Sequence, residues 1–145
     1  MLRRTLLLST VALLPCAALA QATYPSKTIT LVVPAAPGGT TDLTARLLGD
    51  PLSKILGQPV IVDNKPGGNG NIGTVAVARA PADGHTLLVQ YSGYHVGNPW
   101  LQANVPWKGS DFAPVALAIR APQVVVVPVS LPVKTLKEFV DYAKK

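Results

Sequence analysis

The sequence is poor in several residue types, and each shortage excludes a class of protein. Charged residues make up 14% and aromatic residues 6% of the 145 positions, too few charges for a coiled coil or a disordered chain. The formal charge is +6, but the basic residues stand singly and are not interleaved with aromatic ones, which argues against a nucleic-acid partner. No apolar run reaches the roughly 18 residues of a membrane span. Hydrophobic residues are abundant (48%), and 14 prolines and 12 glycines indicate short elements joined by turns.

The first twenty residues have the features of a secretory signal peptide. Two arginines precede an apolar run over residues 6–14, and Ala-Leu-Ala at 18–20 is a small-x-small cleavage signal. Cleavage before Gln21 predicts an exported product. It also removes the lone cysteine, Cys16, which excludes disulfides and cysteine metal sites from the mature chain. A lipid on Cys16 is the alternative, and the proline before that residue disfavours it.

Apolar, β-branched runs alternate with segments of helical periodicity along the mature chain. This alternation predicts an α/β fold with a mostly parallel sheet covered on both faces. Pro51 lies inside the first helix and predicts a kink or break there. Strands are predicted over 28–33, 60–62, 86–89, 112–119 and 124–127. Helices are predicted over 72–80, 97–101 and 135–145, and a first helix has a threonine or aspartate cap within 40–42, apolar residues from Leu43 to Leu56, and Gly57 as its end. The face of the first helix is expected to consist of Leu43, Leu47, Leu48, Leu52, Ile55 and Leu56.

Glycine loops follow the predicted strands, where ligands of parallel sheets bind. Gly38 and Gly39 lie between a strand and a helix start, where free N–H groups and the helix dipole favour an anion. The alternative is a tight turn that needs positive φ and binds nothing; spacing is compatible with both. The segment 68–73 matches GxGxxG, but no acidic residue ends the next strand, which argues against a dinucleotide.

No catalytic constellation is evident among the remaining residues. Ser92 lacks a GxSxG context, and the spacing of the histidines supplies no metal site. His85 is interpreted as a turn residue, whereas His95 is compatible with either a pocket or plain surface. Trp100 and Trp107 are interpreted as packing residues. The sequence therefore predicts neither an enzyme nor a bound cofactor, and a small exported enzyme remains only as a weak alternative.

Five segments, read together and in order, carry a specific resemblance. The chain resembles the periplasmic substrate-binding proteins of tripartite tricarboxylate transporters, the TctC-like or Bug-type receptors, over their front part. The segments that carry the resemblance are TITLVVPAAPGGTTDLTARLL, LGQPVIVDNKPGGNGNIGT, ADGHTLLV, DFAPVALA and LPVKTLKEFVDYAKK.

The resemblance implies a type II, venus-flytrap binding protein that captures a small carboxylate for a membrane permease and acts as a monomer. It implies a signal peptide at 1–20, a first lobe at 21–121, and the crossover strand and first helix of an incomplete second lobe at 122–145. Backbone amides and bridging waters are expected to hold the ligand, with Asp42 as a helix cap and water holder. The positions that match the family's ligand loops are Ala36, Pro37, Gly38, Gly39, Thr40, Thr41, Asp42, Ser92, Gly93, His95 and Asn98.

Some expectations concern single positions. Tyr94 stands where the family commonly has a threonine, so its ring is expected to narrow or reshape the pocket. A β-branched side chain at Gly39 is expected to block the ligand and to strain a positive φ. Lys27 and Arg46 are expected to be solvated surface charges. The alternative to a working receptor is a truncated, non-functional fragment of one.

Overall fold

The computed structural model describes residues 23–122 and 124–145; the predicted signal peptide lies outside the described residues. Contacts divide the chain into two units, one ending at Ala113 and one spanning Pro114–Lys145. The first unit contains β1 (Ile29–Val33), α1 (Thr40–Leu56), β2 (Val60–Asn64), η1 (Gly68–Gly70), α2 (Asn71–Ala78), β3 (Thr86–Leu88), η2 (Gly93–Gly97), α3 (Asn98–Leu101) and η3 (Gly109–Asp111), and the second contains α4 (Leu136–Ala143).

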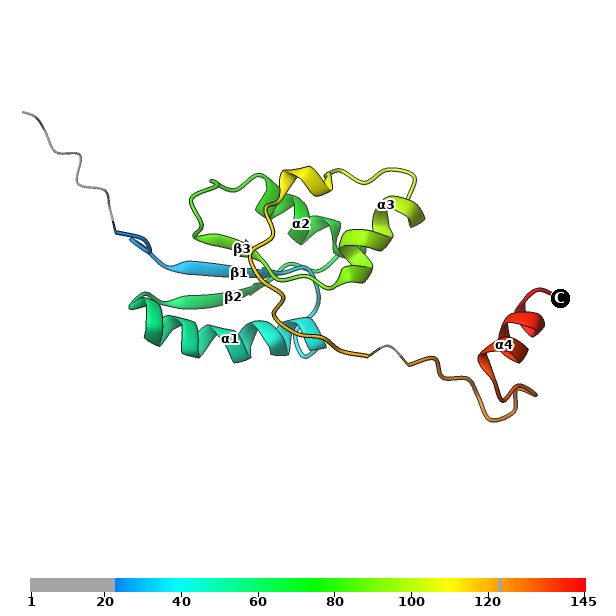
Figure 1. The fold of residues 1–145 in the computed structure, drawn as a ribbon. Helices are drawn as coiled ribbons and strands as arrows, with labels where there is room; N and C mark the ends of the chain where they lie inside the picture. The colour runs from blue at the N-terminus through cyan, green and yellow to red at the C-terminus, as the bar shows by residue number, and fades with distance from the viewer. Residues whose placement is uncertain (1–22, 123) are drawn as a thin grey trace, which may run out of the picture. The chain divides into compact units, whose positions relative to one another are not determined.

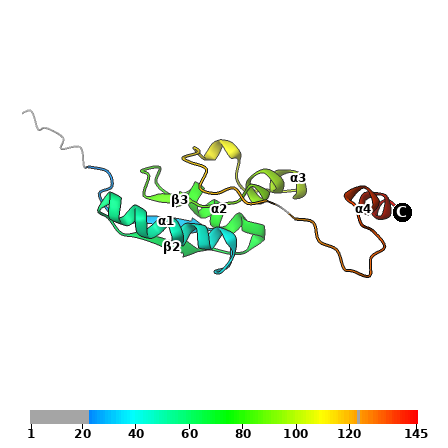
Figure 2. The same ribbon diagram turned by 60° about the horizontal axis from the view of Figure 1, so that its bottom comes forward.

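The sheet of the first unit has three parallel strands in the order β2-β1-β3. Strand β1 is central: Val33 pairs with Asn64 of β2, and Val32 pairs with Leu88 of β3. The two β-α-β crossovers place α1 and α2 on opposite faces of the sheet (Figures 1 and 2), as right-handed connections to strands on either side of β1 require. The α/β fold with a parallel sheet that the sequence predicted is confirmed.

The core lies around β1, which is buried on both faces. Ile29, Leu31, Val32 and Val33 are each 3% exposed or less, and they form the continuous apolar run expected of a central parallel strand. Helix α1 packs its small residues on this strand. Its fully buried side chains include Ala45, and a Cβ on Gly49 would lie 3.7 Å from the carbonyl oxygen of Val60.

The predicted leucine face of α1 is therefore wrong in part. Leu43, Leu47 and Ile55 are 52%, 76% and 78% exposed. The apolar residues of this helix cover more than one face, and the side that touches the sheet is the one whose small residues permit a close approach.

The break predicted at Pro51 is also wrong, since α1 continues to Leu56. Pro51 lies on the exposed side of the helix. Pro51 removes the helical donor of the Leu47 carbonyl. Leu47 is itself exposed, so water can replace that donor.

The two strands predicted over 112–119 and 124–127 do not form, because every residue of both segments lies outside a strand. A strand requires a partner for its N–H and C=O groups, and these segments pair with none of the described strands. Their side chains are largely exposed, for example 81% for Val115 and 83% for Val126. Because the residues after Ala113 add no strand to the sheet, the first compact unit ends there, before the lobe boundary predicted at 121. The assignment of lobes stays a prediction.

The second unit contains α4, which starts with a capping box. The Thr135 hydroxyl accepts the Glu138 N–H at 3.2 Å, and the Glu138 carboxylate accepts the Thr135 N–H at 3.2 Å. On α4, Leu136 is 67% exposed and Val140 39%, whereas Phe139 is partly buried. Within residues 23–122 and 124–145, no helix is both long and apolar enough to cross a membrane.

Candidate ligand-binding edge

Three loops meet at the carboxyl edge of the sheet, because β1, β2 and β3 run parallel. The Lys65 N–H donates to the Val33 carbonyl at 2.8 Å, and the Val89 N–H donates to the Val32 carbonyl at 2.9 Å. These bonds hold the starts of the second and third loops against the end of β1. The loops that contain residues 38–42 and 92–95 therefore share one edge, as predicted (Figure 1).

The first loop leads into an open helix start. Residues 36–40 are exposed, and α1 begins at Thr40 with Gly39 as its N-cap and no side-chain cap. The first intrahelical bond runs from the Leu43 N–H to the Gly39 carbonyl at 2.9 Å. The N–H groups of residues 40–42 precede it and have no partner within the helix. The start of α1 thus offers donors and the positive end of a helix dipole to solvent.

The two glycines of this loop have different roles. Gly38 has φ 89°, a backbone conformation that residues with a side chain rarely adopt, whereas Gly39 has φ −80° and ψ 168°. The positive φ that the turn alternative required thus occurs at Gly38 and not at Gly39. A Cβ on Gly38 would meet nothing within 4 Å, and one on Gly39 only the Ala36 carbonyl at 3.9 Å. A small side chain at either position would therefore meet no steric clash.

Asp42 is turned back into the loop and is 2% exposed. Its Oδ2 accepts the Gly38 N–H at 2.9 Å, and the Arg46 Nε donates to both carboxylate oxygens at 3.1 Å. The bond from Arg46 and that from the Gly38 N–H lower the pKa of Asp42 to about 2. The helix cap expected at Asp42 is therefore wrong: Gly39 is the N-cap, and Asp42 lies in the first turn of α1, where its carboxylate accepts the Gly38 amide.

Arg46 and Asn64 complete this cluster. The Asn64 Nδ2 donates to Asp42 Oδ1 at 3.0 Å and to the Ala35 carbonyl at 3.1 Å, while its Oδ1 accepts from Arg46 Nη2 at 3.1 Å. The expectation that Arg46 is a solvated surface charge is wrong, because its guanidinium pairs with a buried carboxylate. The Asp-x-x-x-Arg spacing on a helix could have predicted the pairing of Asp42 with Arg46. The bond from Arg46 to Asn64 spans 18 residues, and no sequence pattern indicated it.

The third loop presents Ser92 and Gly93 beside two tyrosines. Ser92 is exposed. The rings of Tyr91 and Tyr94 lie 4.6 Å apart between centroids. A Cβ on Gly93 would overlap the Tyr91 ring, and a Cβ on Gly70 would lie 2.5 Å from Cδ2 of Tyr94. Tyr94 thus packs against the glycine loop after β2, and its ring occupies space that a threonine would leave open.

His95 is held in an aromatic cluster and is only partly exposed. Its ring stacks on Trp107 at 5.2 Å with planes 20° apart, and Phe112 meets it edge-on at 5.6 Å. Its Nδ1 lies 3.4 Å from Oε1 of Gln90. Trp107 is 5% exposed, which confirms it as a packing residue, whereas Trp100 is 87% exposed and does not pack. His95 serves this cluster, which neither sequence alternative described.

Asn98 connects two loops. It is 1% exposed; its Nδ2 donates to the Asn69 carbonyl at 2.8 Å, and its Oδ1 accepts from Asn69 Nδ2 at 2.9 Å. Both ends of the amide are therefore committed to Asn69. These bonds form a bridge between α3 and η1, and the ligand contact expected of Asn98 stays a prediction.

The glycines of the GxGxxG segment are explained by packing. Asn69 has φ 54°, and its neighbours Gly68 and Gly70 also have positive φ. A Cβ on Gly73 would lie 2.9 Å from both the Lys65 carbonyl oxygen and Cα of Pro34. The loop is built to turn tightly and to bring α2 close to the sheet.

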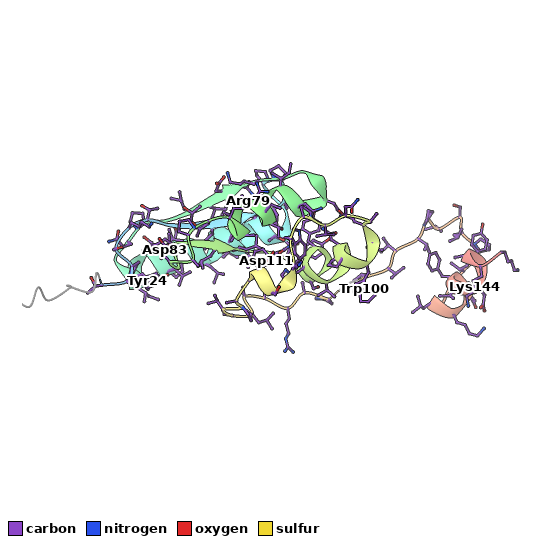
Figure 3. The ribbon with its side chains drawn as sticks, turned by 90° about the horizontal axis from the view of Figure 1, so that it is seen from above. Tyr24, Arg79, Asp83, Trp100, Asp111 and Lys144 are labelled. Carbon is purple, nitrogen blue, oxygen red and sulfur yellow. The ribbon has the colours of Figure 1, made fainter. Side chains whose placement is uncertain are left out.

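The opposite end of this unit is closed by a second cluster, in which Tyr24 and Asp83 lie near each other and far from Trp100 (Figure 3). The Tyr24 hydroxyl donates to the Gly84 carbonyl at 2.8 Å, and the Lys27 ammonium pairs with Asp83 at 2.8 Å. His85 is 7% exposed and its Nε2 accepts the N–H of Ser26 at 3.1 Å. His85 is confirmed as a turn residue, with a structural partner. In the described part of the chain, no three His, Cys, Asp or Glu side chains gather as a metal site.

Three kinds of comparison agree on the family. The sequence profile described as "Tripartite tricarboxylate transporter family receptor" matches residues 44–145. The chain is 40% identical over 123 residues to a UPF0065 protein from the tcbD-tcbE intergenic region of Pseudomonas sp. strain P51, covering 84% of this chain and 36% of that protein. It is 39% identical over 124 residues to BugT of Bordetella pertussis, covering 84% and 38%.

Two solved structures resemble the chain at 38% identity. MatC of Rhodopseudomonas palustris with bound malate has a TM-score of 0.73 and covers 83% of this chain and 42% of that one. The R. palustris protein Rpa4515 with adipate has a TM-score of 0.70, covering 83% and 41%. The chain spans about two fifths of the length of its curated relatives. The chain belongs to the family of tripartite tricarboxylate transporter receptors.

Proposed function

We propose that the chain provides the first ligand-binding lobe of an extracytoplasmic receptor that captures a small carboxylate for a membrane permease. The observation that carries this proposal is the start of α1, which has no side-chain cap and whose first residues, Gly39 and Thr40, are exposed at the edge shared with the third loop. Relatives of similar fold with malate and adipate support a dicarboxylate as the ligand class. The role proposed is binding, not catalysis.

The residues of this edge divide into three groups. The amides of Gly39, Thr40 and Thr41, with Ser92 and Gly93 opposite, are proposed to contact the carboxylate directly or through water. Ala36, Pro37 and Gly38 shape the loop. Asp42, His95 and Asn98 are proposed to position these loops, because their side chains are engaged within the protein.

A proline at position 40 tests the amide account. Thr40 is the first residue of α1, where proline is tolerated because its missing N–H has no helical partner. Gly39 already has the extended conformation that precedes proline well. Thr40→Pro should therefore keep the fold and weaken malate or adipate binding by about tenfold, the worth of one charge-assisted hydrogen bond.

The matched control is Thr40→Ala, which removes the hydroxyl and keeps the N–H. Calorimetry on the full-length mature protein would measure both variants, with the neutral diamides of the same acids as ligand controls. Equal affinity of Thr40→Pro and Thr40→Ala for dicarboxylates would contradict binding through this amide. A wild-type protein that binds no carboxylate of the panel would contradict the proposed function itself.

Export is a part of the proposal that can be tested separately. The apolar run before Ala-Leu-Ala at 18–20 is proposed to direct the chain to the periplasm, with cleavage before Gln21. N-terminal sequencing of the protein recovered from the periplasm should begin at Gln21. An uncleaved start, or a lipid attached to Cys16, would contradict it.

A further inference from the structure

A buried carboxylate stands beside the proposed anion site, and this requires an explanation. Asp42 is the third residue of α1 and is 2% exposed. An anionic ligand at the start of the same helix would meet the field of this carboxylate, because like charges in a partly buried site are poorly screened. The negative charge must be turned away and compensated before an anion binds there.

The contacts of Asp42 supply both requirements. Oδ2 is directed back to the Gly38 N–H at 2.9 Å, and Oδ1 accepts from Asn64 at 3.0 Å. Arg46 lies one turn further along α1, and its guanidinium pairs with the same carboxylate. Its Nε lies 3.1 Å from each carboxylate oxygen, and its Nη2 lies 3.1 Å from Oδ1. The arginine side chain is 53% exposed, so it contributes a positive charge at the rim while its donors point inward.

We propose that Arg46 is a positioning residue of the ligand site, which neutralises Asp42 and holds it against Gly38 without touching the ligand. Asn64 assists from the end of β2, because it bonds Asp42, Arg46 and the Ala35 carbonyl together. This inference rests on the proposed function: it explains how the start of α1 can accept a carboxylate although an aspartate lies in its first turn.

Removal of the arginine charge should expose the carboxylate to the ligand. Arg46→Gln should weaken binding of malate or adipate by about tenfold at about 20 mM salt, and by much less at about 500 mM, since salt screens the repulsion. Arg46→Lys retains the charge and should bind within about threefold of wild type. Lys54→Gln removes the same charge from an exposed position in the last turn of α1 and should leave affinity unchanged.

The double variant Asp42→Asn/Arg46→Gln separates positioning from direct contact. Asparagine at 42 retains an oxygen for the Gly38 N–H and has no charge, so dicarboxylate affinity should return to within about threefold of wild type. If the double variant remains as weak as Arg46→Gln, the arginine contacts the ligand itself and the proposal is overturned. An Arg46→Gln protein that behaves like Lys54→Gln overturns it as well.

Calorimetry would be performed on the full-length mature protein, and thermal melts would check that each variant is folded. If Arg46→Gln does not fold, Asp42→Asn alone decides the question: it should bind dicarboxylate as tightly as wild type or more tightly, and a tenfold loss would overturn the proposal. Wild-type protein that binds neither malate nor adipate would indicate failure of the proposed function, whereas normal wild-type binding with a contrary variant pattern would indicate failure of this inference alone.

Discussion

The Gly38 N–H donates to the buried Asp42 carboxylate at 2.9 Å, so that the loop before α1 is tied to the first turn of the helix that follows it. This bond accompanies the positive φ of 89° at Gly38. Gly38 thus provides the conformation that the loop requires. Its neighbour Gly39 is the N-cap of α1 and has no side chain to cap the helix.

Gly38→Ala should destabilise the protein by about 1 kcal/mol, because an L-residue at positive φ is strained even where space is free. Gly39→Ala is the matched control: Gly39 has φ −80° and a Cβ there would meet only the Ala36 carbonyl at 3.9 Å. Its effect should be smaller, about 0.5 kcal/mol, which is the low end of the cost of alanine at an N-cap. Urea unfolding of both variants is the measurement, and equal losses would contradict the assignment of the strained position to Gly38.

Acid should remove the stabilisation contributed by two carboxylates. Bonds from Arg46 and Gly38 lower the pKa of Asp42 to about 2, and bonds from Lys27 and the His85 N–H hold the pKa of Asp83 well below its ordinary value. A folded-state pKa below the unfolded one means that the stabilisation is present above the unfolded pKa, near 4, and is lost as pH falls toward the folded one.

Unfolding midpoints in urea should therefore fall between pH 4 and pH 2 in the wild type, and fall less steeply in Asp83→Asn. Asp50→Asn is the control, since Asp50 is exposed on α1. The titration of the Gly38 amide proton, followed by NMR, should report Asp42 ionisation, with its midpoint moved upward in Arg46→Gln. A midpoint that is unchanged in Arg46→Gln would contradict the role of the arginine in lowering the pKa.

The local elements were predictable from sequence because short-range patterns determine them. The strand predicted over 60–62 corresponds to β2 at Val60–Asn64, and the helix predicted over 72–80 corresponds to α2 at Asn71–Ala78. The parallel order of the strands then placed the glycine loops at one edge without knowledge of any side-chain contact. Periodicity and turn residues carry this much information.

The remainder depended on contacts between distant residues. The run over 112–119 has the composition of a strand but pairs with none of the described strands, and composition does not reveal a partner. The pairing of Arg46 with Asn64 and the bridge from Asn98 to Asn69 join residues 18 and 29 positions apart. No sequence pattern predicts either contact. The first makes Arg46 a partner of a buried carboxylate, and the second uses the Asn98 side chain to connect two loops.

The contact of Tyr94 with the glycine loop yields the last prediction. Gly70 has φ 85°, and a Cβ on it would lie 2.5 Å from the Tyr94 ring. Gly70→Ala should therefore lose stability through both backbone strain and overlap with the ring, about 2–3 kcal/mol in total. Tyr94→Thr removes the overlap and leaves the strain. In a double-mutant cycle measured by urea unfolding, Gly70→Ala should cost about 1–2 kcal/mol less in the Tyr94→Thr background than in the wild type. Additive losses would contradict a direct contact between these residues, and the ring would then have to lie elsewhere in the loop, where it could not narrow the site beside Ser92.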